Sequence, residues 1–282
     1  MPLARLTAAA PALAALLAAA SPAAAETVRF DTVFGSFDVD LFDEATPGHV
    51  ANFLGYVDAG EYDGTIFHRA AEDDQGREFV VQGGAFRYDG EPVSTPFDLG
   101  SVPNRGPVAN EPGISNTRGT LALARVGGQE DSGTNQFFFN LKDNGFLDGV
   151  DGGFTVFGEV ADDTGLSILD QIAGVPTFRG GAPFGELPLR DFAFEDGVTP
   201  ELGPDEFVLI HSVARVAVDG DGNDAVDDGG VDVPVDGGGG GGGGVPDPVA
   251  VPTPAAAVTG LLGLAVCALR RPLRGDAAAD AG

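Results

Sequence analysis

Short apolar stretches separated by turn-forming residues constrain the fold of this chain more than any other feature of its sequence. Gly, Pro, Asn and Asp stand between these stretches, which is typical of β-strands joined by short turns. Two apolar alternations on either side of Gly35-Ser36 predict a hairpin at 28–41. Further stretches predict strands at 65–69, 79–82, 120–125, 136–140, 154–160 and, longest of all, near 207–218.

Two helices are expected between the strands. The first begins with Thr46 as N-cap and Pro47 at the first helical position, and Gly60 is well placed to end it. The second is expected at 164–172, where apolar residues recur at helical spacing. Many strands and two helices favour a mainly β fold, a closed barrel with helical plugs, over a doubly wound sheet.

The first 25 residues are typical of a secretory signal. They contain Arg5, then an apolar run, then the small-residue ending Ala23-Ala24-Ala25. The sequence therefore predicts a signal peptide at 1–25 and an exported protein, periplasmic or on the cell surface. The single cysteine, Cys267, excludes an internal disulfide, so an exported domain must be stabilised by its core alone.

The charge of the chain excludes one class of partner. Its 43 Asp and Glu residues outnumber its 15 Lys and Arg residues, which gives a formal net charge of −28. Such a field repels phosphate backbones, so nucleic acid is not expected to bind.

A change of composition after residue 218 marks the end of the predicted domain. Residues 219–250 are acidic and rich in glycine, with eight consecutive glycines from Gly237 to Gly244. Such a segment is too polar to form a core and predicts a disordered linker. We therefore expect one folded domain at 26–218.

Six ordered motifs carry the functional signal. They are Phe67-His68-Arg69, Phe79-x-x-Gln82-Gly83-Gly84, Gly119-Thr-Leu-Ala-Leu-Ala-Arg125, Asn135-Gln136-Phe137-Phe138-Phe139-Asn140, Phe146-Leu147-Asp148 and Val156-Phe157-Gly158. In this order and spacing they resemble the cyclophilin-type peptidyl-prolyl isomerases, in a version similar to the bacterial exported branch. The resemblance runs from about Val28 to Val218 and implies a closed, eight-stranded antiparallel β-barrel capped by two α-helices.

The resemblance also implies the roles of individual residues. Arg69 would donate a hydrogen bond to the prolyl nitrogen, and the main chain at Ala124-Arg125 would align the peptide as an added extended segment. Gln82 and Gln136 would contact the substrate backbone. The apolar pocket for the proline ring would comprise Phe79, Val80, Phe138, Leu147 and Phe154, with Phe146 beside it.

The implied chemistry needs neither a metal nor any other cofactor. A catalyst of rotation about an Xaa-Pro bond needs only to bind the twisted bond better than the planar forms, so the expected partners are proline-containing polypeptides. If Arg69 and Gln82 point to a common face, they place a cation and an amide beside an apolar surface; alternation then predicts that His68 points to the opposite face from Arg69, and we expect it to be buried and hydrogen-bonded. In the same way, Phe138 should leave the face of Phe137 and Phe139.

Four positions depart from the best-known members of the family. Val80 stands where those have Met, Phe146 where many have Trp, Phe154 where many have His, and Arg125 where Asn is common. In addition, residues 70–78 form a longer and more acidic connection than the compact family pattern. This connection either biases the charge of the substrate near the pocket or is a solvated loop.

The C-terminal segment has a resemblance of its own. Residues 251–274 combine Val251-Pro-Thr-Pro, an apolar run and Arg270, Arg271 and Arg274, which resembles the sorting signals of PEP-CTERM proteins. This resemblance implies an exosortase-type processing enzyme as a partner. The alternative is a permanent membrane anchor with its arginines on the cytoplasmic side, followed by a short tail at 275–282.

Two other functions are compatible with the sequence. The domain could capture proline-containing segments without catalysis, or it could be a structural component of the cell surface for which the tail is the functional part. Arg69, Gln82 and Phe138 favour the enzyme, because a binder or scaffold has less need of a cation at the prolyl nitrogen.

Overall fold

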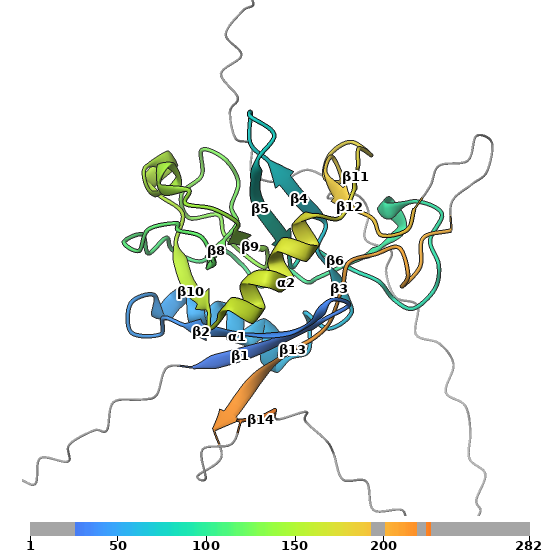
Figure 1. The fold of residues 1–282 in the computed structure, drawn as a ribbon. Helices are drawn as coiled ribbons and strands as arrows, with labels where there is room; N and C mark the ends of the chain where they lie inside the picture. The colour runs from blue at the N-terminus through green and yellow to red at the C-terminus, as the bar shows by residue number, and fades with distance from the viewer. Residues whose placement is uncertain (1–25, 193–200, 219–223, 227–282) are drawn as a thin grey trace, which may run out of the picture.

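The computed structural model describes residues 26–192, 201–218 and 224–226, and these form a mainly β fold with two α-helices (Figure 1). The predicted signal peptide, nearly all of the predicted linker and the C-terminal segment lie outside the described residues. Among the residues described, neither α-helix is long and apolar enough to span a membrane. The mainly β prediction is confirmed.

One antiparallel sheet contains 12 of the strands. Its hydrogen-bonded order is β4-β5-β9-β8-β10-β2-β1-β13-β3-β6-β7, and β14 pairs with β13. The bounds of these strands are β1 Thr27–Thr32, β2 Gly35–Leu41, β3 Thr65–Ile66, β4 Arg69–Glu72, β5 Glu78–Gly83, β6 Phe86–Arg87, β7 Gly100–Ser101, β8 Thr120–Leu123, β9 Phe137–Asn140, β10 Val156–Val160, β13 Leu209–Val218 and β14 Asp224–Val226. A separate pair joins β11 (Thr177–Phe178) to β12 (Leu187–Pro188).

The sheet curls because only two residues link β3, near one end of the strand order, to β4 at the other end. The predicted strand at 65–69 is in fact divided into β3, which pairs with β13, and β4, which pairs with β5. Between them the N–H of Phe67 donates to Val208 and the N–H of His68 donates to Gln82, at 2.9 and 3.0 Å. The prediction of a single strand at 65–69 is therefore wrong, since the pairing changes from β13 to β5 at Phe67-His68.

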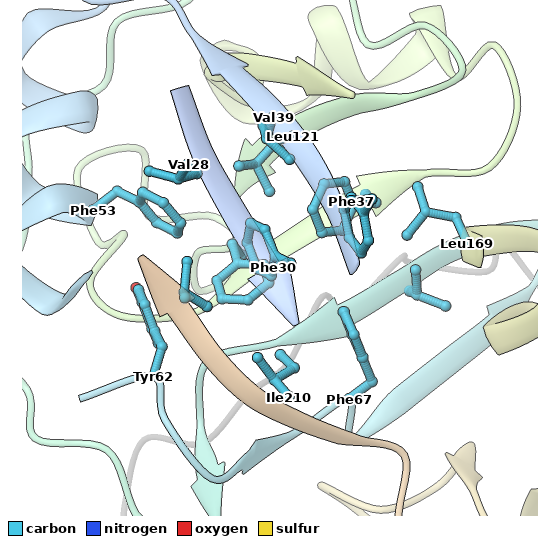
Figure 2. Packing of buried hydrophobic residues seen from close by; sticks show 14 of the residues in the cluster. Val28, Phe30, Phe37, Val39, Phe53, Tyr62, Phe67, Leu121, Leu169 and Ile210 are labelled. Atoms are coloured by element: carbon cyan, nitrogen blue, oxygen red, sulfur yellow. The ribbon is translucent and has the colours of Figure 1, made fainter. Parts of the chain in front are cut away.

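The inner face of the curled sheet forms the main core (Figure 2). The rings of Phe30 and Phe37, which are directly opposite each other on β1 and β2, stack with their centroids 5.2 Å apart. Phe137 and Phe139 on β9 meet Phe30 edge-on at 5.7 and 5.5 Å. Aromatic rings from β1, β2 and β9 thus pack against one another in the core, in stacked and edge-on orientations that are favourable.

Both predicted helices are present and both contribute to this core. Helix α1 (Pro47–Asp58) buries Phe53, and helix α2 (Asp163–Ala173) buries Leu169. Thr46 is the N-cap residue of α1 as predicted, but its hydroxyl donates to the Phe42 carbonyl rather than accepting from the helix.

The carboxylate of Glu111 satisfies the amide groups at the start of α1 instead. Its two oxygens accept from the N–H groups of Gly48 and His49 at 3.2 and 3.0 Å, which anchors the long loop before β8 to the helix. The other end of α1 agrees with the prediction, since Gly60 follows the helix with φ +62°.

Several short elements escape the strand pattern because each has too few residues to show a period. These are the strands β6, β7, β11, β12 and β14 and three 3₁₀ helices, Pro96–Asp98 (η1), Gly145–Asp148 (η2) and Val150–Gly152 (η3). The predicted connection at 70–78 is also corrected, because Ala70 to Glu72 continue β4 and only the next residues form the turn.

Candidate active site

Four residues on four neighbouring strands form a row across the outer face of the sheet. Arg69 on β4 is directly opposite Gln82 on β5, Gln82 is opposite Phe138 on β9, and Phe138 is opposite Ala122 on β8. Directly opposite residues of antiparallel strands share a face, so a cation, an amide and an aromatic ring stand side by side. Arg69 and Gln82 therefore point to a common face.

An apolar cluster, separate from the main core, surrounds this row. Phe138 belongs to this cluster, whereas Phe137 and Phe139 belong to the core behind it, as the alternation predicts. The site therefore has an apolar base that does not take part in the main core. The cluster brings together Ala71, Phe79, Val80, Ala122, Ala124, Phe138, Leu147, Phe154 and Val156, which include every residue that was predicted to contact the proline ring.

Two aromatic pairs give the cluster its sides. The ring of Phe154 meets Phe138 edge-on, with centroids 5.8 Å apart and an interplanar angle of 77°. Phe146 stacks on Phe79 at 5.8 Å and 22°. Phe146 is 54% exposed, while the other three rings are buried. Phe146 therefore forms an outer rim against which a peptide has apolar surface to contact.

Arg69 lies at the edge of this cluster with 18% of its side chain exposed. Its Nε donates to Oε2 of Glu186 at 2.9 Å. Its Nη1 is buried and has no hydrogen-bond partner among the described residues. A buried donor without a partner is costly in a finished core, so this group indicates a functional rather than a structural role for Arg69.

The two glutamines also meet as the predicted site requires. Nε2 of Gln82 donates to Oε1 of Gln136 at 2.8 Å. Gln82 is fully buried, and its Oε1 has no partner within the described part of the chain. The pair thus fixes the amide plane of Gln82 and leaves one acceptor unused.

Arg125 does more than sequence reasoning assigned to it. Its guanidinium lies 4.3 Å from the centre of the Phe154 ring, and its Nη2 donates to the carbonyls of Val150 and Gly153 at 2.7 and 3.1 Å. Only 6% of the residue is exposed. The side chain therefore fixes the loop that carries Phe154, in addition to any contact that the main chain makes.

The predicted alignment of the peptide by the main chain at Ala124-Arg125 stays a prediction, with one limit at Ala124. Its N–H already donates to the carbonyl of Gln136 at 2.8 Å. An added peptide strand cannot use this N–H, so pairing there would have to involve the remaining main-chain groups.

Buried amides behind the pocket form a network that the sequence analysis missed. Nδ2 of Asn140 donates to Asn116 and Thr120, and Nδ2 of Asn144 donates to Oδ1 of Asn140 and to the Phe79 carbonyl. Asn116 in turn donates to Asp148 and to the carbonyl of Phe154. The network fixes η2, which carries Phe146 and Leu147, against the sheet.

His68 is buried, as predicted, but its Nδ1 has no hydrogen-bond partner among the described residues. Burial and the adjacent charge of Arg69 lower the pKa of His68 to about 3. The imidazole is therefore neutral near pH 7, and its ring contacts Phe86 edge-on at 5.2 Å. These features indicate a structural residue rather than a general base.

A cavity of about 480 Å³ adjoins the row at Arg69. One wall comes from the β4–β5 turn, where Asp73 accepts from Arg77 at 2.7 Å and also pairs with Lys142, and these bonds lower the pKa of Asp73. The cavity is lined by Arg69, Glu72, Asp73, Asp74, Gln75, Arg77, Phe79, Lys142, Asp143, Asn144 and Phe146. Whether these acidic residues bias the choice of substrate stays a prediction.

Comparison with known proteins identifies the family. Residues 27–192 match the family described as Cyclophilin type peptidyl-prolyl cis-trans isomerase/CLD. A peptidyl-prolyl cis-trans isomerase of Acinetobacter baylyi is 38% identical over 171 residues, which cover 60% of this chain and 83% of that protein. Peptidyl-prolyl cis-trans isomerase A of Dickeya dadantii is 38% identical over 187 residues, 64% of this chain and 89% of the relative.

Peptidyl-prolyl cis-trans isomerase B of Escherichia coli is 37% identical over 181 residues, which cover 62% of this chain and 99% of that protein. This match extends over nearly the whole length of the relative, and residues 27–192, which match the family model, include Arg69, Gln82 and Phe138. The chain belongs to the cyclophilin-type peptidyl-prolyl cis-trans isomerase family.

Proposed function

We propose that this member of the family accelerates rotation about Xaa-Pro bonds of exported polypeptides, and that Arg69 donates to the prolyl nitrogen during rotation. Family membership carries the isomerase activity itself. The observation that supports the role of Arg69 is its position in the row with Gln82 and Phe138, with its buried Nη1 without a partner among the described residues.

The role of the arginine follows from the electronic structure of the amide. Delocalisation of the nitrogen lone pair opposes rotation by roughly 18–20 kcal/mol. A donor that hydrogen-bonds to the nitrogen holds that lone pair and thereby weakens the partial double bond. A guanidinium presents its donors in a rigid plane, so that of Arg69 would stabilise the twisted bond more than the planar forms.

The apolar cluster would hold the proline ring while the preceding carbonyl rotates. Val80, Phe138, Leu147 and Phe154 supply the base of this pocket, and Phe146 covers its open side. The free Oε1 of Gln82 would accept from a substrate N–H, which fixes the peptide next to the proline. Rotation about the Xaa-Pro bond without a covalent step requires that the proline ring stay fixed while the preceding carbonyl moves.

The proposal includes export of the protein and a role for its C-terminal segment, residues 251–274. The composition of residues 1–25 supports export, and that of 251–274 supports either processing by an exosortase-type enzyme or retention as a membrane anchor. For the fold, we propose the closed eight-stranded barrel that the family resemblance implies, because Phe67-His68 link β4, at one end of the strand order, to β3 near the other end.

The turnover of a short Ala-Pro-Phe peptide by the full chain tests the role of Arg69. Wild type should accelerate cis-to-trans isomerisation, and Arg69→Ala should lower kcat/KM by about 100- to 1,000-fold, as removal of a donor to the transition state does in other enzymes. Arg29→Ala is the matched control, because Arg29 pairs with Asp38 on the β1–β2 hairpin away from the row. Equal activity of all three proteins would refute the proposal for Arg69.

A further inference from the structure

An arginine that donates to a transition state has to be held in one orientation. Its side chain has several rotatable bonds, and a free guanidinium would lose much rotamer freedom each time a substrate bound. Arg69 stands on β4, the strand at one end of the hydrogen-bonded order, so only one neighbouring strand supports it. Some other contact must therefore fix its guanidinium.

Glu186 makes that contact. The bond from Arg69 Nε to Glu186 Oε2, at 2.9 Å, is the one side-chain hydrogen bond of Arg69 within the described residues. Because the carboxylate binds at Nε, it fixes the plane of the guanidinium and leaves Nη1 without a partner among those residues. The ion pair is therefore arranged to orient the donor, and it does not use up the Nη1 group.

Glu186 is itself held firmly against β4. Its main-chain carbonyl accepts from the N–H of Ala70 at 2.9 Å, so two consecutive residues of β4 bind to one glutamate. The next residue, Leu187, is fully buried and begins β12, which pairs with β11. Phe184, two residues before Glu186, is buried against the ring of Phe86 at 4.6 Å.

We propose that Glu186 is a positioning residue for the isomerisation, which holds the guanidinium of Arg69 in the plane that aims its Nη groups at the prolyl nitrogen. This inference rests on the proposed role of Arg69. Glu186 lies 117 residues away from Arg69 in the chain, so only the tertiary structure brings the two side chains into contact. Its action is on the rate of rotation and not on the binding of the proline ring, which the separate apolar cluster performs.

The test compares Glu186→Ala, Glu186→Gln and Glu186→Asp in the full chain, each with and without Arg69→Ala. We expect Glu186→Ala to lower kcat for the Ala-Pro-Phe peptide by about tenfold while KM stays within about twofold of wild type. Glu186→Gln should retain at least about half of the activity, because its amide oxygen still accepts from Nε. Asp205→Ala, which removes an exposed carboxylate of a nearby loop, is the control for the change in net charge.

The double variants separate positioning from a structural role. With Arg69→Ala present, Glu186→Ala should have no further effect on kcat, since there is no guanidinium left to orient. Equal losses with and without Arg69, or equal activities of Glu186→Ala and wild type, would overturn the inference. If Arg69→Ala itself keeps full activity, the proposed role of Arg69 fails together with this inference; if Arg69→Ala loses activity and Glu186→Ala does not, only this inference fails.

A spectroscopic measurement covers the case in which Glu186→Ala does not fold. The ¹H–¹⁵N signal of Arg69 Nε, assigned by its loss in Arg69→Lys, should be sharp and slow to exchange with water in wild type and in Glu186→Gln. It should broaden or exchange faster in the shorter Glu186→Asp, whose carboxylate does not reach Nε from the same main-chain position. A signal unchanged in Glu186→Asp would overturn the inference.

Discussion

The two faces of β5 and β9 contrast strongly, although they belong to the same few residues. On the inner face Val81, Phe137 and Phe139 join the main core and have no polar atoms to satisfy. On the outer face Gln82 and Phe138 adjoin Arg69, and both polar residues keep a buried atom without a partner among the described residues.

Two other residues near the pocket, Arg125 and Asn144, also have buried side-chain atoms that lack a partner within the described residues. The remaining atoms of this kind belong to His68, whose ring contacts Phe86, and to Arg87 on β6, near the other end of the strand order. Unsatisfied buried groups reduce stability, so their concentration at one face indicates that this face is arranged for a ligand and the other for the fold.

The largest change in stability is expected from a substitution on the inner face. Phe137→Ala removes a fully buried ring that contacts Phe30, Phe53 and Tyr62, and should lower the free energy of unfolding by about 3–5 kcal/mol. Denaturant unfolding of the full chain measures it. A loss below about 1 kcal/mol would show that the inner face is not the stabilising one.

The pH dependence of stability should come next in size. Folding lowers the pKa of His68 from 6.5 to about 3. The neutral imidazole therefore contributes fully to the free energy of unfolding above pH 6.5, and this contribution is lost as the pH falls toward 3. Between pH 7 and pH 5 this group alone should reduce the free energy of unfolding by about 2 kcal/mol, at roughly 1.4 kcal/mol per unit. His68→Leu should flatten the pH profile by that amount, and an unchanged profile would contradict the assignment.

Arg125→Met tests how far the outer face depends on its buried cation. The change keeps an apolar stem but removes the contact with Phe154 and the two bonds to the loop at Val150 and Gly153. We expect KM for the peptide to rise by about three- to tenfold, which corresponds to about 1 kcal/mol, while kcat changes little. If kcat falls and KM stays constant, Arg125 acts on the rotation itself.

The smallest effect should separate neighbouring rings. Phe138→Leu and Phe139→Leu remove similar volumes, and each should cost about 1 kcal/mol of stability. Only Phe138→Leu should also lower kcat/KM, by several-fold, because Phe138 belongs to the pocket and Phe139 to the core. Equal activity of the two variants would remove the functional difference between the faces.

The contrast between the faces could be predicted from the sequence in large part. Strand alternation separates Phe138 from its neighbours, and the family resemblance implies that Arg69 and Gln82 converge on one site; the register agrees with both. The motifs also single out residues of the apolar cluster, because most of these lie within strands or in one short 3₁₀ helix, while Ala124 and Phe154 lie just outside β8 and β10.

What escaped prediction depends on contacts between distant segments. Glu186 reaches Arg69 from the residue just before the two-residue strand β12, which has no periodic signal, and the side chain of Arg125 folds back onto Phe154. Asn116 and Asn144 reach Asn140, at the end of β9, because two loops converge there, and nothing in the local sequence of Asn116 and Asn144 distinguishes them from ordinary turn residues. The split of residues 65–69 into β3 and β4 similarly depends on two different partner strands.

The most direct test of the account follows binding and rotation in one sample. Exchange NMR of an Ala-Pro-Phe peptide with the full chain reports both the dissociation constant and the cis–trans rate of the bound peptide. For Arg69→Ala we predict a dissociation constant within about threefold of wild type, because the apolar cluster is intact. The bound peptide should then rotate about as slowly as the free peptide, with a time constant of roughly tens to hundreds of seconds. Fast exchange retained by Arg69→Ala would contradict the central claim that this guanidinium drives the rotation.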